Sequence, residues 1–175
     1  TNLSSGGMRI DFADGHFRQL PLLSEGPFRY ANYAVQYLQH AKGKTNTPIK
    51  QAVISASALS LIYPPTGIEG YAQGTFIGDL IDECEKDIRM CLEAGAHKVQ
   101  MDFTEGRLSL KLDPSGGVLR QFIDLNNHVF NRFSDEDRKR IGIHVCPGGD
   151  HDSTHSADVD YNDFLVFLPY SNVII

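Results

Sequence analysis

The sequence has 175 residues, 41% of them hydrophobic and 22% charged, which predicts one folded domain and excludes a disordered chain. With 16 Lys and Arg against 22 Asp and Glu the net charge is −6, and without a basic cluster this excludes a general phosphate-binding surface for nucleic acid. The longest apolar-leaning stretch, residues 52–68, contains serines, a Tyr-Pro-Pro and a glycine, so it cannot cross a membrane.

Short apolar runs alternate with amphipathic stretches along the chain. In chain order, the pattern first predicts a strand at Arg9–Phe12, a helix from Pro27 to about Ala41 and a strand at Ile49–Ser55. It then predicts a helix at about Thr75–Ala94, a strand at His97–Phe103 and a helix from Asp113 to Phe133. The last predicted elements are a strand at Arg140–Cys146, a polar loop, a short helix at Asp160–Leu168 and the opening of a strand at Ser171–Ile175. Cys84 and Cys91 fall on the apolar face of the second helix and read as core sulfur.

Strands that alternate with helices predict parallel strands joined by crossover helices. An open flavodoxin-like sheet and a (β/α)₈ barrel both fit this order. A complete barrel needs about 250 residues, with about 200 as a practical minimum. At 175 residues, either the sheet is open or part of a barrel is missing.

Polar residues cluster at the predicted carboxyl ends of the strands, where parallel α/β folds bind their ligands. The four clusters are Asp11–His16, Ser55–Ser57, Asp102–Arg107 and His144–Asp150. Asp102 ends an apolar strand and is suited to hold a substrate ammonium group or to act as a base. Glu105 either contacts substrate or pairs with Arg107. The sequence has no glycine-rich phosphate loop and no Gly-x-Ser-x-Gly elbow, which makes nucleotide-driven chemistry and serine hydrolysis poor candidates.

His144 and Cys146 are two residues apart at the end of a predicted strand, so both side chains point to the same face. A thiolate and an imidazole are good zinc ligands, and a catalytic zinc needs at least one more protein ligand. His151 and His155 could complete a closed four-ligand structural site instead, although a solvated loop rich in Asp, Ser and His is the favoured explanation for them. A calcium site is a weaker alternative, because its candidate ligands lack the EF-hand spacing. These candidates are Asp150, Asp152, Asp158 and Asp160.

Three stretches of the sequence resemble the cobalamin-independent methionine synthase group of the uroporphyrinogen decarboxylase/methionine synthase-like superfamily, and most of all a shorter, single-barrel branch. They read PIKQAVISASALSLIYP, HKVQMDFTEGRLSLKLDPSGG and IGIHVCPGGDHDSTHSADVDY, and they span roughly Pro48 to Tyr161. The resemblance implies a (β/α)₈ barrel with a zinc-bound thiolate that receives a methyl group. It aligns His144 and Cys146 with the family's zinc pair, and Asp102 with the aspartate that holds the substrate's ammonium group.

The sequence also departs from the family pattern. The strand end reads Met-Asp-Phe-Thr-Glu where the family has Ile-Asp-Glu-Pro, so the substrate is expected to differ. The family's two further zinc ligands, a glutamate and a cysteine, have no counterpart before Ile175. We therefore expect residues 1–175 to be a single domain and part of a larger TIM barrel, with about four to five βα units present, or a truncated homologue.

The leading hypothesis is a zinc-dependent methyltransferase that activates a homocysteine-like thiol, with a folate-type or other methyl donor. Its predicted catalytic residue is Asp102, its substrate-binding residues are Asp102, Glu105, Ser55 and Ser57, and its metal ligands are His144 and Cys146. One alternative is a metal-free decarboxylase or lyase that uses Asp102, Arg107 and Asp14 on an acidic substrate, for which Arg18 and Arg107 are the only plausible arginines. The other is a truncated, non-catalytic homologue.

The predicted partner is a small thiol or amino-acid substrate, with no nucleic acid and no membrane. Self-association through exposed sheet edges, giving a homo-oligomer, stays open. Three cysteines are few and odd in number, as is typical of reduced thiols, and no apolar leader opens the sequence. Both observations predict a cytoplasmic protein.

Overall fold

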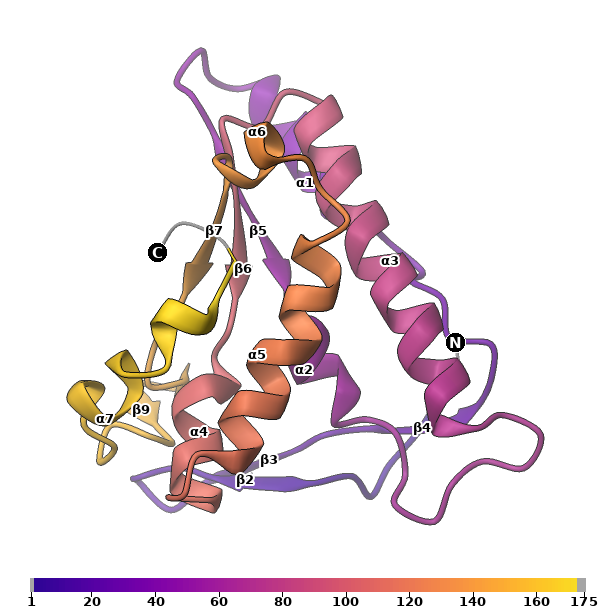
Figure 1. Ribbon diagram of the computed structural model, residues 1–175, viewed down its shortest axis with the longest axis vertical. Coiled ribbons are helices and arrows are strands. Elements are labelled where there is room, and N and C mark those ends of the chain that lie inside the picture. Colours follow the sequence, from indigo (N-terminus) through magenta and orange to yellow (C-terminus); the bar gives the residue numbers. More distant parts are fainter. Residues whose placement is uncertain (1, 173–175) are drawn as a thin grey trace.

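The computed structural model describes residues 2–172, and a parallel sheet of three strands lies at its centre (Figure 1). The strands are β5 (Lys50–Ile54), β6 (Lys98–Asp102) and β7 (Ile141–His144), in the order β5-β6-β7. Their register pairs Ile54 with Asp102 and Asp102 with His144, so the three strands end side by side. The sequence predicted each of these strands to within two residues.

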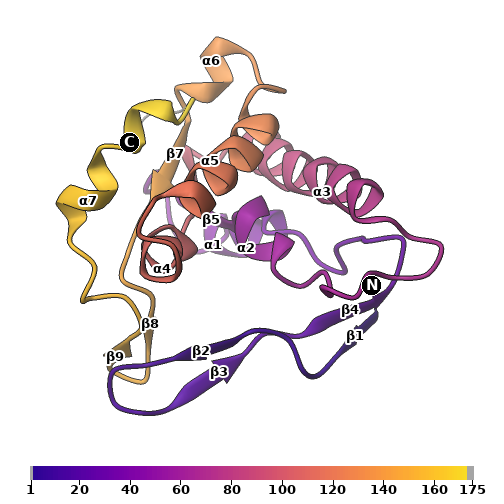
Figure 2. The ribbon, with the colours of Figure 1, turned by 60° about the horizontal axis from the view of Figure 1, so that its bottom comes forward.

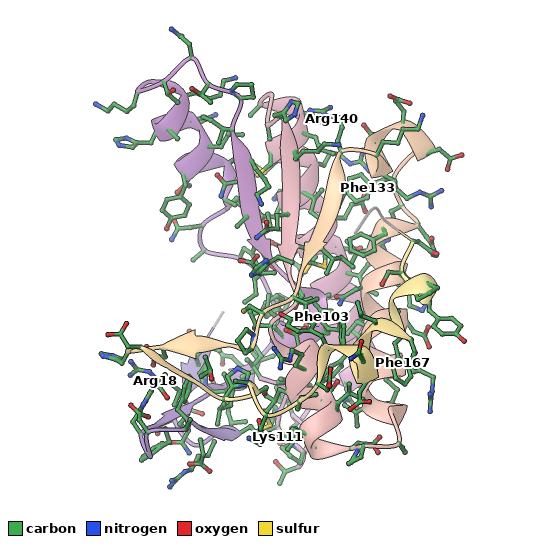
Figure 3. The ribbon with its side chains drawn as sticks, turned by 90° about the vertical axis from the view of Figure 1, so that its left-hand side faces the viewer. Arg18, Phe103, Lys111, Phe133, Arg140 and Phe167 are labelled. Atoms are coloured by element: carbon green, nitrogen blue, oxygen red, sulfur yellow. The ribbon has the colours of Figure 1, made fainter. Side chains whose placement is uncertain are left out.

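The two faces of this sheet differ because side chains alternate along each strand. Val53, Val99, Met101 and Ile141 are buried on the face that the helices cover. The opposite face is open to the viewer in Figure 3, and Asp102 belongs to it because it alternates with Met101. The sheet therefore has one packed face and one that is free to contact a ligand.

Helices α2, α3 and α5 lie together on the packed face (Figure 1). Their bounds are Ala56–Ser60, Gln73–Glu93 and Gly117–Phe130. Helix α3 buries Phe76, Leu80 and Ile88 along one stripe, as the apolar periodicity predicted. The thiols of Cys84 and Cys91 are buried on the same stripe, which raises the pKa of each to about 12.

The first predicted helix is shorter than expected, since α1 spans only Val35–Lys42. The preceding segment is held in an irregular path by carboxylates of α3. Glu83 accepts a hydrogen bond from the backbone N–H of Tyr30 at 3.0 Å, and Asp87 accepts one from that of Ala34 at 2.7 Å. Side chains of another helix thus satisfy amides that a longer α1 would have used within itself.

The segment between β6 and α5 holds a helix that the sequence did not predict. Helix α4 (Glu105–Leu112) begins directly after the end of β6 and was not predicted. Asp113 ends α4, and its Oδ2 accepts a hydrogen bond from the backbone N–H of Val118, in the first turn of α5, at 2.9 Å. Helix α5 thus begins at Gly117, four residues after the predicted start at Asp113, and the helix before it was missed.

The first residues form an extended N-terminal arm, residues 2–25, that runs along one side of the molecule (Figure 2). It holds two antiparallel pairs, β1 with β4 and β2 with β3. The strands are β1 (Asn2–Ser4), β2 (Arg9–Asp11), β3 (Phe17–Gln19) and β4 (Leu22–Glu25). The strand predicted at Arg9–Phe12 is therefore present, but it pairs in this arm and not in the parallel sheet.

The last third of the chain is made of short elements. They are α6 (Asp135–Arg138), the antiparallel pair β8 (Gly149–Asp150) and β9 (Ser153–Thr154), α7 (Tyr161–Leu165) and a 3₁₀ turn, Leu168–Tyr170. The short helix predicted from Asp160 is thus confirmed as α7, which Asp160 caps by accepting from the backbone N–H of Asn162 at 2.8 Å. The strand predicted at Ser171–Ile175 falls mostly on residues 173–175, which lie outside the described part.

The barrel prediction was wrong. Over residues 2–172 the parallel strands number three and not four to five, and the remaining strands form separate two-stranded antiparallel sheets. The physical reason lies at the two ends of the chain, where short strands pair with their own neighbours through tight antiparallel contacts and do not extend the parallel sheet. Among the helices of these residues, none is long and apolar enough to cross a membrane.

Candidate functional site

Asp102 lies at the centre of the edge where the three parallel strands end. Its neighbours in register are Ile54 on β5 and His144 on β7. Gln100, two residues earlier on the same face, donates a hydrogen bond from Nε2 to Asp102 Oδ1 at 2.6 Å and so holds the carboxylate on the open face. In Figure 3 the labelled Phe103 marks the point just beyond this edge. The sequence predicted that Asp102 and His144 each lie at the end of a strand, and the register places these two strand ends side by side.

A hollow of about 670 Å³ opens between this edge and the segment before α1. Its size is typical of sites that bind small molecules. Polar side chains on its wall come from Asn32, Asp87, Asp102 and Thr104, besides the tyrosine hydroxyls. The remainder is aromatic or aliphatic: Phe28, Tyr30, Tyr33 and Tyr37, with Ala52, Ile54 and Leu59 among the aliphatic residues. Asp102 therefore faces a cavity large enough for an amino acid.

Ser55, Ser57 and Glu105 come together beneath this edge, but as a buried network. Ser55 Oγ donates to Glu105 Oε1 at 2.6 Å, and Ser57 Oγ donates to the same oxygen. Asn126 of α5 donates from Nδ2 to Ser57 Oγ at 2.7 Å, and its Oδ1 accepts from the backbone N–H of Ser57 at 3.2 Å. The structure thus places both predicted substrate-binding serines against a carboxyl, and both are fully buried.

Glu105 is an ionisable side chain that is almost fully buried. Its burial raises the pKa of its carboxyl above the usual range, and the hydroxyls of Ser55 and Ser57 only partly oppose this. Its second oxygen, Oε2, is buried and has no hydrogen-bond partner among the described residues. A protonated carboxyl fits this arrangement, because it carries no charge to desolvate. Glu105 therefore ties β5, α2, α4 and α5 together below the site.

Arg107 does not pair with Glu105, although two residues separate them. The Arg107 side chain is buried, and its guanidinium donates to the carbonyl oxygens of Ala157 and Val159, the former at 3.2 Å. The guanidinium carbon also lies 4.2 Å from the centre of the Tyr161 ring. Arg107 thus fastens the segment before α7 to α4, and Arg18 is paired with Asp150 far along the chain.

The four candidate zinc ligands lie in one stretch of chain but in different environments; they are His144, Cys146, His151 and His155. Cys146 Sγ accepts from the backbone N–H of Gly148 at 3.4 Å. His151 is exposed in a left-handed turn, 3.7 Å from Asp150. His155 is buried, its Nδ1 lies 2.6 Å from Ser156 Oγ, and burial lowers the pKa of its ring. The His155 ring packs so closely over Gly148 that a side chain there would collide with it.

The zinc centre that the family resemblance implies is not assembled by these residues. Within residues 2–172, no three side chains of His, Cys, Asp or Glu are grouped so that they could hold a metal ion. The same finding applies to the closed four-ligand alternative and to the calcium alternative. His144 and Cys146 supply two donors, whereas a catalytic zinc needs three. The described residues therefore do not fit a zinc ion by themselves.

Sequence reasoning missed several residues of the site. Tyr30, Tyr33 and Tyr37 recur at helical spacing within the helix predicted from Pro27, and nothing in this spacing indicated that they line the hollow. Asn126 was passed over inside the apolar stripe of α5. A buried amide in such a stripe needs a partner, and this was the available signal for the network around Ser57. No signal in the sequence linked the tyrosines to the end of β5.

Comparison with known proteins yields a likeness of fold. No protein-family model and no curated protein matches the sequence. Among solved structures, one similar chain is the B12-independent methionine synthase from Shewanella sp. W3-18-1 in complex with selenomethionine. The two superpose with a TM-score of 0.63 at 14% sequence identity, over 96% of this chain and 48% of that chain. The chain thus spans about half the length of that synthase and shares the fold of that part.

Proposed function

We propose that this chain supplies the amino-acid binding site of a methyltransferase-like protein related to the cobalamin-independent methionine synthases. The observation that carries the proposal is the position of Asp102, at the meeting edge of three parallel strands and on the wall of a 670 Å³ hollow. The resemblance in sequence motifs and the likeness of fold both support this family relation.

In this proposal the carboxylate of Asp102 accepts hydrogen bonds from the ammonium group of a thiol-bearing amino acid such as homocysteine. Gln100 keeps the carboxylate oriented by its bond to Oδ1. A charge-assisted hydrogen bond of this kind is short and strong, so it fixes one end of the substrate. The apolar wall of the hollow then receives the carbon chain and the sulfur.

The zinc dependence stays a prediction about His144 and Cys146, and the proposal routes no step through a metal. The decarboxylase alternative is less well supported, because an acidic substrate needs free arginines. Arg107 is engaged with backbone carbonyls and Tyr161, and Arg18 with Asp150. The non-catalytic alternative differs in predicting no amino-acid binding at Asp102.

The test is calorimetric titration of the chain with L-homocysteine, compared with 4-mercaptobutanoate, which lacks the ammonium group. Loss of a charge-assisted hydrogen bond costs about 1.5–3 kcal/mol, so Asp102→Asn should weaken homocysteine binding by roughly tenfold to a hundredfold. The same substitution should leave the weaker binding of 4-mercaptobutanoate unchanged. Asp124→Asn, an exposed aspartate on α5, is the matched control and should behave as the parent protein.

Two results would contradict the proposal. One is an absence of homocysteine binding by the parent protein. The other is an equal loss for both ligands in Asp102→Asn, since that would mean the substitution acts on the fold and not on the ammonium group.

A further inference from the structure

The hollow next to Asp102 has a wall of three tyrosines. Tyr30, Tyr33 and Tyr37 all line it and come from one short segment. The Tyr30 and Tyr33 rings lie 5.6 Å apart between centres, inclined at 38°. Both are fixed to α3 by their hydroxyls: that of Tyr33 donates to Glu83 at 2.5 Å, and that of Tyr30 lies 3.2 Å from Cys84 Sγ. The third ring, of Tyr37, is 66% exposed.

The charged residues that line the hollow are both acidic, and the cations Arg29 and Lys86 lie outside its lining. Its charged lining residues are Asp87 and Asp102, and none of the described residues that line it is Lys, Arg or His. Glu83 lies directly behind Tyr33, near the guanidinium of Arg29 at 3.9 Å. The Lys86 ammonium approaches the Tyr33 ring to 4.6 Å from its centre, so this ring already accepts one cation. An electron-rich aromatic wall flanked by carboxylates attracts positive charge.

The lining also discriminates between kinds of cation. A primary ammonium needs hydrogen-bond acceptors, which Asp102 supplies at the strand edge, whereas the hydroxyls of Tyr30 and Tyr33 are already engaged with α3. A quaternary ammonium or a sulfonium group has no N–H to satisfy, and ring faces can surround it without a hydrogen bond. The tyrosine wall therefore suits an onium centre, and the carboxylate of Asp102 supplies a compensating charge in the same hollow.

We propose that the tyrosine wall binds an organic onium cation, a quaternary ammonium or sulfonium group carried on a small molecule. The proposal goes beyond the amino-acid site, because it concerns Tyr30, Tyr33 and Tyr37 and requires neither methyl transfer nor an ammonium group on Asp102. A hollow of about 670 Å³ has the size of sites that enclose drug-sized ligands, so it is large enough for such a molecule.

The experiment compares choline with 3,3-dimethylbutan-1-ol, which has the same shape and no charge. Each is titrated into the chain while the tyrosine ring resonances are followed by NMR. Choline should shift the resonances of the tyrosine wall in a saturable way, and the neutral alcohol should bind at least several times more weakly. Equal binding of the two, or no saturable shift with choline, would overturn the proposal.

Substitution of Tyr37 tests the ring itself, since this exposed side chain can be changed without opening the core. Cation–π contacts of about 0.5–2 kcal/mol correspond to a loss of roughly twofold to thirtyfold in choline affinity for Tyr37→Leu. Tyr37→Phe keeps the ring and should retain binding. Tyr170→Leu, at a tyrosine that is 64% exposed and does not line the hollow, is the matched control.

Choline binding that is the same in Tyr37→Leu as in the parent protein would also overturn the proposal. Its failure is separable from that of the amino-acid site. Homocysteine bound through Asp102 without choline binding would refute the onium site alone. Choline binding that depends on Tyr37, in a chain that does not bind homocysteine, would refute the amino-acid site alone.

Discussion

The parallel core and the N-terminal arm are held together by different forces. The core buries large apolar side chains between the sheet and α3, and Phe76, Leu80, Val99 and Met101 are all fully enclosed. The arm exposes most of its strand residues and buries chiefly Leu23, whose N–H donates to the carbonyl of Ile62 at 2.8 Å. Burial of apolar area thus stabilises the core, whereas the arm depends on individual polar contacts.

The far end of the arm is fastened to the β8–β9 hairpin. The backbone N–H of Ala13 donates to the carbonyl of Thr154 at 3.0 Å, and Arg18 is ion-paired with Asp150. The His16 ring lies between two carboxylates, with Nδ1 at 2.5 Å from Asp14 and Nε2 at 3.4 Å from Asp150. Such contacts position the arm but are weak at an exposed surface. The comparison indicates that the arm has a defined position although the contacts that hold it contribute little free energy.

The largest expected difference between the two regions is in unfolding free energy. Phe76→Ala removes a ring that is 0% exposed and contacts the rings of Phe28 and Tyr63. This change should cost about 3–5 kcal/mol. Phe17→Ala in the arm removes a ring that is 50% exposed and covered on one face by Arg9, and it should cost less than about 1 kcal/mol. Urea denaturation followed by circular dichroism measures both. Equal losses would show that arm and core unfold as one unit.

The two regions should also respond to pH with opposite sign. Burial raises the folded-state pKa of Glu105, so its contribution to stability is complete below its unfolded pKa and is lost as the pH rises through the folded value. Glu105→Gln cannot ionise and keeps an oxygen for Ser55 and Ser57. The stability of this variant relative to the parent protein should therefore improve steadily as the pH rises from about 4.5, the usual glutamate range. Denaturation midpoints at several pH values measure this, and a constant difference would refute a neutral Glu105.

Asp150 provides the contrasting case in the arm. The hydrogen bond from Arg18 lowers the pKa of this carboxyl below its usual range. Its contribution is therefore present above the unfolded pKa and is lost as the pH falls through the folded value. Acid should accordingly loosen the contact between arm and hairpin while Glu105, protonated, still supports the core.

The smallest effect is expected from Asp150→Asn, which removes the ion pair with Arg18 and the contact with His16. Amide hydrogens of residues 9–19 should exchange faster, while those of α3 and β6 keep their rates, because local opening of the arm leaves the core intact. Hydrogen exchange read by mass spectrometry resolves the two sets of peptides. Asp11→Asn, at an exposed pair with Arg9 inside the arm, is the control and should leave exchange of the Ala13 amide unaltered. Faster exchange throughout α3 would mean that arm and core are coupled.

Much of the core could be predicted from the sequence, because period and burial coincide there. Strands β5, β6 and β7 and helices α3 and α5 all carry apolar residues at the spacing of their own secondary structure. The prediction failed for residues 27–34, where Glu83 and Asp87 of α3 capture the backbone amides of a segment with helical spacing. It also failed for the barrel, since strand alternation cannot tell how many strands a sheet recruits or whether it closes.

The candidate site was likewise predicted from the sequence only in part. The sequence placed Asp102 and His144 at carboxyl ends of strands, because the alternation of strands and helices implies a parallel sheet, and the structure made these strands neighbours. It could not distinguish Asp102, which lines the hollow, from Ser55 and Ser57, which are buried against Glu105. The identity of a polar residue does not reveal whether its partner is a ligand or another part of the chain.

What the sequence by itself determined is the local conformation of the central strands and helices and the position of Asp102 at the end of β6, since both follow from the spacing of apolar residues along the chain. Only the tertiary structure decided that the sheet has three parallel strands over the described residues, that Glu105 is enclosed by Ser55, Ser57 and Asn126, and that three tyrosines face a hollow beside Asp102. These features depend on contacts between residues that lie far apart in the chain. Their energies come from burial and hydrogen bonding in the folded state, and the spacing of residues along a sequence does not specify them.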